Sequence, residues 1–324
     1  MLLLREDDVR ALLSMEDTLG AVEDAFLRQV DGTVRYRPRE RLRMPSGTLN
    51  VLPAADLSLG VGGLKTYIAL RGAARFVVLL FDLESSDLLA MVEADYLGMM
   101  RTGAASGVAS KHLAAAKERH TLAVIGCGWQ ARGQIEAVAA SCPVGEVRVF
   151  SRTGEQREEF ALKIEEELSL PCIAATSAAE ATAGATVICT ATNAATPVLA
   201  AADVAPGTHI NAAGSNSLLR RELPDELVRR AQTIVVDSRA QAEGECGDLL
   251  AALQSGWLDL QSLPELGEVL VGRCAARTAD SDVTIFESQG LGSQDVAVAA
   301  HLYRLAQDVG AGEDIAFASG SVPH

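Results

Sequence analysis

The sequence has little positive charge, no paired cysteine motif and no long uncharged apolar run, and each absence excludes a class of protein. Only 28 lysines and arginines stand against 43 acidic residues, and the net charge of -15 argues against a nucleic-acid or anionic-lipid surface. Six cysteines stand without a CxxC pair or a histidine cluster, so we expect reduced thiols and no metal site. No segment approaches about 18 uncharged apolar residues, and the start MLLLREDDVRALL lacks the basic region of an export signal. We therefore expect a cytoplasmic protein whose partners are small molecules, with neither nucleic acid nor a membrane among them.

Hydrophobic spacing divides the 324-residue chain into a β-rich first part and an alternating second part. Residues 5–30 show helical spacing, with Ser14 and Asp17 as caps between two helices. Residues 35–92 change to a period of two, which indicates an antiparallel meander, and MMRTGAASGVASKHLAAAK then predicts a helix. From residue 121 strands alternate with helices, which is typical of a parallel sheet covered on both faces. The predicted fold class is α/β: a doubly wound Rossmann domain plus a β-rich domain.

The stretch LAVIGCGWQARGQIEA places a glycine motif between a strand and a helix. Gly126 would form the tight turn, Gly128 would let the backbone approach a pyrophosphate, and Ala131 would pack helix against strand. The helix is expected from Gln130 onward, and its free amides and dipole suit phosphate groups. Trp129, directly before it, is a further cofactor candidate. The motif in this context predicts a dinucleotide site, and the alternative is a glycine turn that binds nothing.

The end of the next strand bears on the choice of nucleotide. An NAD site usually has an acidic residue there for the ribose 2′-hydroxyl, whereas this chain has Ser151, Arg152 and Thr153, which suit a 2′-phosphate. NADP(H) is therefore favoured and NAD(H) remains possible. In the alternative interpretation Arg152 is a solvated turn cation and the site accepts either nucleotide.

Several motifs, in order along nearly the whole chain, carry a family resemblance. GLKTY, MMRTGAASGVASKHLA, VIGCGWQA, HINAAGSN followed by RRELP, VVDS, and FESQGLGSQDVAVA together resemble the ornithine cyclodeaminase and mu-crystallin family. The resemblance implies a homodimer in which residues 1–115 and 294–324 form a dimerisation and substrate domain and residues 116–293 form the NAD(P)-binding Rossmann domain. It also implies an oxidoreductase that acts on amino or imino acids, such as a 1-pyrroline-2-carboxylate reductase or an alanine dehydrogenase.

The resemblance places a clamp for the substrate carboxylate on Lys65, on Arg101 and on one basic residue of RPRERLR. A guanidinium suits a carboxylate because it forms two parallel hydrogen bonds, and we expect Arg101 to begin a helix. Arg39, Arg41 and Arg43 would share one strand face, and of these we select Arg39. Snorkelling of Lys65 and a surface position for Arg101 are the structural alternatives.

Asn216 departs from the family pattern, because cyclodeaminases and some alanine dehydrogenases have an aspartate at this position. An asparagine takes no proton, which weakens a cyclodeaminase interpretation, since ornithine cyclisation needs a deprotonated amine. Reduction of an imine that is already protonated needs no base to remove a proton from the substrate. Asn216 could still orient the substrate nitrogen. We therefore assign catalytic roles to Lys65, Arg101 and Asn216. Ornithine cyclodeamination with recycled NAD and nucleotide binding without turnover remain the two alternatives.

Further contacts are predicted at strand ends, because ligands of a doubly wound sheet lie beyond its carboxyl edge. Gln289 is expected to face the substrate. Asp237 is interpreted as a strand-end cap, the run EGECGD (243–248) as a solvated helix, and His209 as a core residue. The additional cofactor candidates stand at these strand ends or within the motifs of the resemblance: Thr102, Thr190, Ala191, Thr192, Ala213, Gly214, Ser215, Arg220, Ser288, Leu291 and Gly292.

Overall fold

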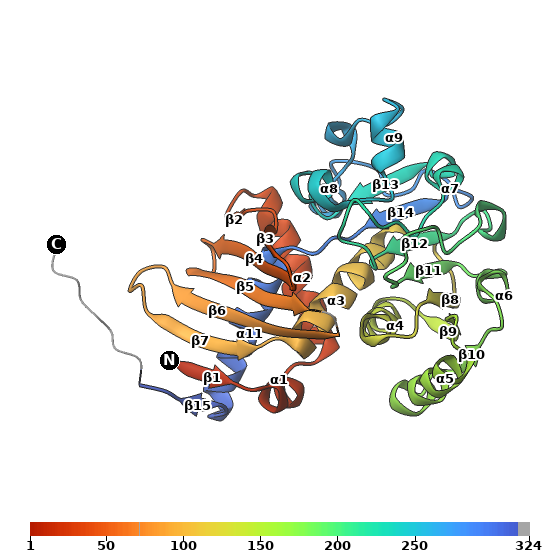
Figure 1. Cartoon of the computed structure of the whole chain (residues 1–324). Helices are drawn as coiled ribbons and strands as arrows, with labels where there is room; N and C mark the ends of the chain where they lie inside the picture. Colours follow the sequence, from red (N-terminus) through yellow and green to blue (C-terminus); the bar gives the residue numbers. More distant parts are fainter. Residues whose placement is uncertain (71, 317–324) are drawn as a thin grey trace. The chain divides into compact units, whose positions relative to one another are not determined.

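The computed structural model describes residues 1–70 and 72–316, which belong to two compact units (Figure 1). Of the described residues, unit 1 contains 1–101 and 291–316, and unit 2 contains Thr102–Gly290. The first division falls within helix α3 (Asp95–Leu113). The boundary predicted from the sequence lies after that helix, between residues 115 and 116. The predicted boundary at which the chain re-enters the first domain lies between residues 293 and 294.

Unit 1 is built on a sheet of eight strands among the described residues, in the order β15-β1-β7-β6-β5-β4-β2, with β3 paired to β4. Neighbours from β4 to β7 are antiparallel, which confirms the predicted meander. The strands are β1 (Leu2–Leu4), β2 (Val34–Tyr36), β3 (Glu40–Met44), β4 (Gly47–Asp56), β5 (Val61–Leu70), β6 (Ala73–Asp82), β7 (Leu88–Glu93) and β15 (Glu313–Asp314). The helices are α1 (Glu6–Leu12), α2 (Met15–Val30), the first part of α3, and α11 (Gly292–Val309).

Alternation along the strands of unit 1 gives the sheet two different faces. Leu52, Val78 and Leu80 are buried on the face covered by α11, which also packs against α2 (Figure 1). The predicted cap Ser14 precedes α2, since its Oγ accepts a hydrogen bond of 3.1 Å from the Asp17 amide. Asp17, also predicted as a cap, lies instead in the first turn of α2. On the opposite face Leu42 and Ile68 are exposed apolar side chains.

Unit 2 contains the predicted parallel sheet, in the order β10-β9-β8-β11-β12-β14-β13. Every neighbouring pair is parallel. The strands are β8 (His120–Ile125), β9 (Val144–Phe150), β10 (Cys172–Ala174), β11 (Val187–Thr190), β12 (His209–Ala212), β13 (Thr233–Val236) and β14 (Thr284–Glu287). The helices are α4 (Trp129–Ser141), α5 (Gly154–Leu168), α6 (Ala178–Thr182), α7 (Asp225–Arg230), α8 (Arg239–Glu245), α9 (Leu250–Gln254) and α10 (Leu266–Leu270), with 3-10 turns at Ala201–Asp203 and Leu260–Ser262. The order reverses between β8 and β11, and ligands of such sheets bind at that switch point.

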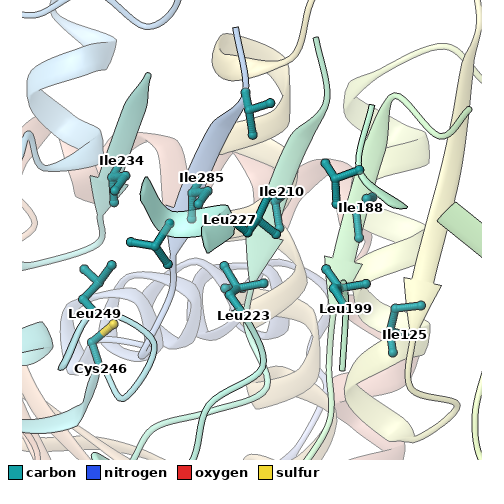
Figure 2. Packing of buried hydrophobic residues seen from close by; sticks show 14 of the residues in the cluster. Ile125, Ile188, Leu199, Ile210, Leu223, Leu227, Ile234, Cys246, Leu249 and Ile285 are labelled. Carbon is teal, nitrogen blue, oxygen red and sulfur yellow. The ribbon is translucent and has the colours of Figure 1, made fainter. Parts of the chain in front are cut away.

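Both faces of the parallel sheet are buried, which explains why its strands are almost continuously apolar. Ile125, Ile188, Ile210 and Ile285 belong to one core, shown in Figure 2. Alternate residues of β8 and β11, such as Val124, lie in a second core with α4 and α5. His209 is in the interior as predicted, where burial lowers its pKa to about 3.

Two local interpretations of the sequence are wrong. Arg101 does not begin a helix: α3 starts at Asp95, so Arg101 lies well inside it. The run EGECGD is not a solvated helix either, because Glu245 and Asp248 are buried. Their surroundings supply polar partners that a sequence pattern does not reveal: Asp248 Oδ1 accepts hydrogen bonds from two backbone amides. Among the described residues, no helix is both long and apolar enough to cross a membrane.

Candidate active site

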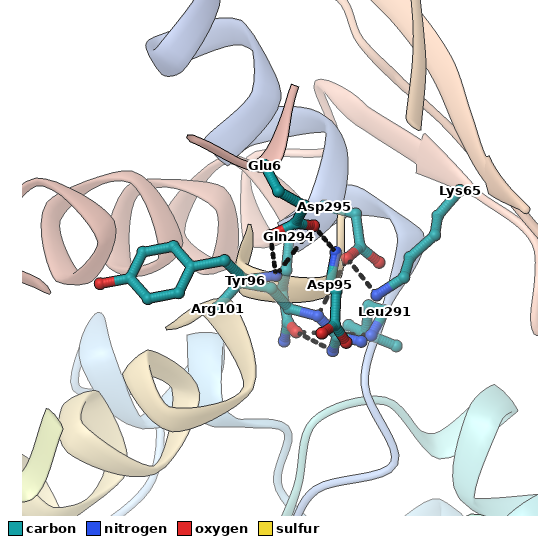
Figure 3. Close-up of polar contacts among 8 residues, drawn as sticks. All are labelled: Glu6, Lys65, Asp95, Tyr96, Arg101, Leu291, Gln294 and Asp295. Atoms are coloured by element: carbon teal, nitrogen blue, oxygen red, sulfur yellow. Dashed lines mark hydrogen bonds and ion pairs between the residues drawn. The ribbon is translucent and has the colours of Figure 1, made fainter. Parts of the chain in front are cut away.

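Two basic side chains of unit 1 meet at one buried carboxylate (Figure 3). Lys65 on β5 and Arg101 on α3 donate to the same atom, Asp295 Oδ1 on α11, with Lys65 Nζ and Arg101 Nε each 3.0 Å from it. Arg101 Nη1 also donates to Gln294 Oε1 at 3.1 Å. We call Lys65, Arg101, Gln294 and Asp295 the basic cluster. Two nitrogens of the guanidinium are held by α11, so its plane is fixed in orientation.

Two features of α3 position the side chains of the basic cluster. Glu6 accepts hydrogen bonds from the amides of Asp95 and Tyr96, which anchors the first turn of α3 (Figure 3). Gly98 lies one helical turn before Arg101, and a Cβ there would be 2.7 Å from Lys65 Nζ. Any larger residue at this position would therefore displace the lysine.

The basic cluster carries more positive than negative charge. Burial lowers the pKa of Lys65 to about 8; the attraction of Asp295 opposes this, and the positive charges of Arg101 and Arg39 lower the pKa further. Arg39, the residue selected from the sequence, thus acts electrostatically on Lys65. Two buried cations on one carboxylate leave an excess of positive charge, which a bound anion would offset.

Unit 2 contains a pocket of about 1000 Å³ at the carboxyl ends of β8, β9, β11 and β12, and we call it the strand-end pocket. Most of the predicted cofactor residues line it. They are Gly126, Gly128, Trp129, Gln130, Ser151, Arg152, Thr153, Ala191, Thr192, Ala213 and Gly214. The pocket thus lies at the switch point of the sheet, where the topology predicts a ligand.

The backbone of the strand-end pocket fits a dinucleotide. Gly126 has a φ of 118°, and a Cβ there would collide with the Ala191 carbonyl, so the turn requires glycine. Gly128 is the N-cap of α4 and has no side chain to occupy the first amides of that helix. Ser151, Arg152 and Thr153 follow β9 on the pocket wall. These residues can hold a pyrophosphate and a ribose.

Other predicted residues lie outside the lining of the strand-end pocket. Ala131 is buried in α4, as expected for a packing residue, and Thr190 donates to Glu222. Ser215 Oγ donates to the carbonyls of Ser217 and Arg220, while the Arg220 side chain is exposed. Asn216 follows in the same loop after β12. The remaining members of this set are placed as follows: Thr102 in α3, Ser288 and Gln289 after β14, and Leu291 and Gly292 at the start of α11.

Gln289 is supported by a buried carboxylate. Asp237 Oδ2 accepts hydrogen bonds from the Gln289 and Gly290 amides at 2.8 and 2.6 Å. Burial raises the pKa of Asp237 to about 7, against these two hydrogen bonds. Asp237 therefore fixes the loop after β14, in agreement with the predicted capping role.

Sequence reasoning missed Asp295 and Gln294 in the basic cluster. One signal was present, because Asp295 stands in helical register with Ala299, Leu302 and Ala306 on the buried stripe of α11. A carboxylate on such a stripe requires a cationic partner. Glu222 was missed as well, and we find no sequence pattern that distinguishes it from a surface glutamate.

The doubly wound sheet, its glycine turn and the strand-end pocket define a dinucleotide-binding protein of the Rossmann class. Residues 1–309 match the Ornithine cyclodeaminase/mu-crystallin family. The chain belongs to this family, which confirms the resemblance seen in its motifs.

Similar proteins have related activities. The Delta(1)-pyrroline-2-carboxylate reductase of Bacillus cereus is 35% identical, covering 98% of this chain and 100% of the relative. The structure of the Thermococcus litoralis Delta(1)-pyrroline-2-carboxylate reductase with NADH and L-proline has a TM-score of 0.93 at 30% identity, with 97% and 100% coverage. An archaeal alanine dehydrogenase dimer with bound NAD has a TM-score of 0.90 at 33% identity, with 98% and 99% coverage. These relatives agree with the predicted class, an NAD(P)-dependent oxidoreductase acting on imino or amino groups.

Proposed function

We propose that this protein reduces 1-pyrroline-2-carboxylate, a cyclic imino acid, to proline with NADPH. The observation that carries the proposal is the excess of buried positive charge around Asp295, which suits a small carboxylate. The family, and the activity of relatives that match along the whole chain, supports the choice of an imino acid.

We assign the substrate carboxylate to Arg101 and Lys65, with Arg39 as a further cation. The fixed guanidinium of Arg101 would provide directional hydrogen bonds, because Asp295 and Gln294 already hold its Nε and Nη1. Lys65, with a pKa of about 8, carries its proton at neutral pH and loses it in mildly alkaline solution. It would therefore serve both as a cation for the carboxylate and as a proton source for the product amine.

The nucleotide supplies the hydride, and the chain supplies its binding and orientation. We assign the phosphates to the turn at Gly126 and Gly128 and to the first amides of α4, and the ribose to the residues after β9. Asn216 and Gln289 would orient the substrate nitrogen, a task that needs no proton transfer by either residue.

We propose NADP(H) over NAD(H) because Arg152 lies on the pocket wall where a 2′-phosphate would be held. Replacing Arg152 by alanine should weaken NADPH binding about 10- to 100-fold, the usual range for a charge-assisted hydrogen bond, and leave NADH binding within about twofold. Titration of nucleotide fluorescence measures both. The exposed Arg273 of the same unit provides the control Arg273→Ala, which should bind both nucleotides normally. Equal affinity of the native protein for NADH and NADPH, unchanged in Arg152→Ala, would overturn the NADP assignment.

We also propose that the protein is a cytoplasmic homodimer, with residues 1–115 and 294–324 as its dimerisation and substrate domain and residues 116–293 as its nucleotide domain. The exposed Leu42, Ile68 and Leu70 extend from one sheet face of unit 1 and provide an apolar surface for a second copy.

The purified protein should consume NADPH and produce proline in equal amounts when given 1-pyrroline-2-carboxylate. Absorbance at the nicotinamide band follows the first and amino-acid analysis the second. Pyruvate with ammonia tests the alanine dehydrogenase activity, and ornithine tests the cyclodeaminase activity, which releases ammonia without net change in NAD. Tight NADPH binding without turnover of any of these substrates would contradict the proposal and favour a binding protein.

A further inference from the structure

Glu222 is a buried carboxylate beside the strand-end pocket that none of the roles above uses. Its side chain is fully buried in the segment before α7. Glu222 Oε2 accepts hydrogen bonds from Thr190 Oγ1 and the Gly214 amide, each at 2.9 Å. Glu222 Oε1 accepts one from the Thr192 amide at 2.7 Å. One carboxylate therefore joins the ends of two neighbouring strands, β11 and β12.

The backbone of the same residue fixes a second point on the loop after β11. The Glu222 carbonyl accepts a hydrogen bond of 2.8 Å from the Val198 amide, so the segment 192–198 is tied at both ends to Glu222. Asp248 in turn holds Glu222 in place, because its Oδ1 accepts from the amides of Glu222 and Leu223 at 2.6 Å each.

The segments tied to Glu222 form one wall of the strand-end pocket, since residues 191–198, Ala213 and Gly214 all line it. The approach is so close that a Cβ at Gly214 would collide with Thr192 and with the Glu222 carboxylate. We propose that Glu222 is a positioning residue for nucleotide binding: its carboxylate holds residues 192–198 and Gly214 in the conformation that accepts the cofactor. The positioning role of Glu222 rests on one part of the proposed function, namely that the strand-end pocket binds a nicotinamide nucleotide.

A carboxylate suits this role because it accepts on both oxygens, and all three groups facing it can donate. A glutamine would direct its NH2 group towards one of these donors and lose a hydrogen bond there. Burial raises the pKa of Glu222 to about 7, the negative charge of Asp248 raises it further, and hydrogen bonds from Thr192 and Thr190 oppose the rise. Other titratable groups that interact with Glu222 are Glu287 and Cys189. The negative form, which accepts all three bonds, is therefore lost as the pH falls through about 7.

The variant Glu222→Gln tests the proposal against Glu226→Gln, the same chemical change at an exposed position on α7. We expect Glu222→Gln to raise the Kd and the KM for NADPH about tenfold, since charge-assisted hydrogen bonds to two loops are weakened. The KM for 1-pyrroline-2-carboxylate should change less than the KM for NADPH, because the proposed ligands of its carboxylate, Lys65 and Arg101, belong to the basic cluster and not to the segments that Glu222 holds. Hydrogen exchange should become faster at the Thr192 and Gly214 amides, and Glu226→Gln should match the native protein in every measurement.

A pH series adds a signature that general destabilisation does not produce. In the native protein NADPH binding should weaken as the pH falls from 8 to 6.5, and Glu222→Gln should lack this component. The titration of the nucleotide's 2′-phosphate, near pH 6 for phosphate esters, is common to both proteins and cancels in the comparison.

Unchanged NADPH affinity and unchanged amide exchange in Glu222→Gln would overturn the positioning role. Should that variant fail to fold, Thr190→Val removes one donor and keeps the carboxylate; it should raise the KM for NADPH about threefold, and an unchanged KM would then overturn the proposal. If the native protein binds no NADPH, the proposed function fails, whereas exchange at Thr192 and Gly214 in Glu222→Gln still tests the positioning.

Discussion

Replacing Arg101 by lysine is expected to lower kcat/KM for 1-pyrroline-2-carboxylate by about 100-fold. The guanidinium is held in one plane by Asp295 and Gln294, whereas an ammonium offers no second parallel hydrogen bond to a carboxylate. Loss of a charge-assisted hydrogen bond in a buried site costs about 3 kcal/mol, which corresponds to that factor. Steady-state kinetics over a range of imino acid concentrations measures the change, and most of it should appear in the KM for the imino acid.

The control for this experiment is Arg304→Lys, which makes the same change at an exposed position of α11 and should retain native kinetics. NADPH affinity provides a second control, since none of the residues that line the strand-end pocket is altered. Native kinetics in Arg101→Lys would show that Arg101 is not a ligand of the substrate carboxylate.

The change Asp295→Asn is expected to destabilise unit 1 and to shift the pH dependence of activity. It leaves Lys65 and Arg101 buried without their shared negative charge, at a cost of about 3 kcal/mol, or a fall in Tm of roughly 6–12 °C. The Asp295 charge raises the pKa of Lys65, so without it that pKa falls below about 8. The alkaline decline of kcat/KM should therefore begin at a lower pH than in the native enzyme.

The sign of the linkage gives this prediction a second test. A lowered lysine pKa means that the folded protein disfavours the charged form, so the penalty is complete below the folded pKa and is relieved as the pH rises through it. The difference in Tm between the native protein and Asp295→Asn should accordingly be larger at pH 6 than at pH 9. The exposed Asp308 on the same helix provides the control Asp308→Asn. A Tm loss that is the same at both pH values would argue against a charged Lys65 as its cause.

Local patterns were sufficient to predict much of the lining of the strand-end pocket. The glycine turn at Gly126 and Gly128 was recognisable because its φ requirement and its place between strand and helix are local properties. Arg152 was selected as a nucleotide residue because it directly follows a predicted strand. Lys65 and Arg101, by contrast, were predicted from motifs shared with a family. Neither spacing nor composition shows that two residues on different elements lie close together.

The buried carboxylates were the main failure of the sequence interpretation. Glu245 and Asp248 were taken as part of a solvated helix, because acidic residues are exposed unless something pairs with them. Asp248 accepts from the backbone amides of Glu222 and Leu223, which are 26 and 25 residues away along the chain, and which amides are available depends on how loops pack. Glu222 shows this directly, since its three donors come from two other strand ends.

By itself the sequence determined the order of strands and helices, the parallel sheet, the nucleotide turn and the family. Each of these depends on periodicity or on short motifs, which the chain carries locally. Only the tertiary structure decided which charges are buried and what they contact: Asp295 between Lys65 and Arg101, and Glu222 between the loops of the strand-end pocket. The reason is that desolvation and nearby hydrogen-bond donors determine whether a buried carboxylate is charged and what it contacts. Folding creates both, and the residues next to the carboxylate in the sequence do not reveal them.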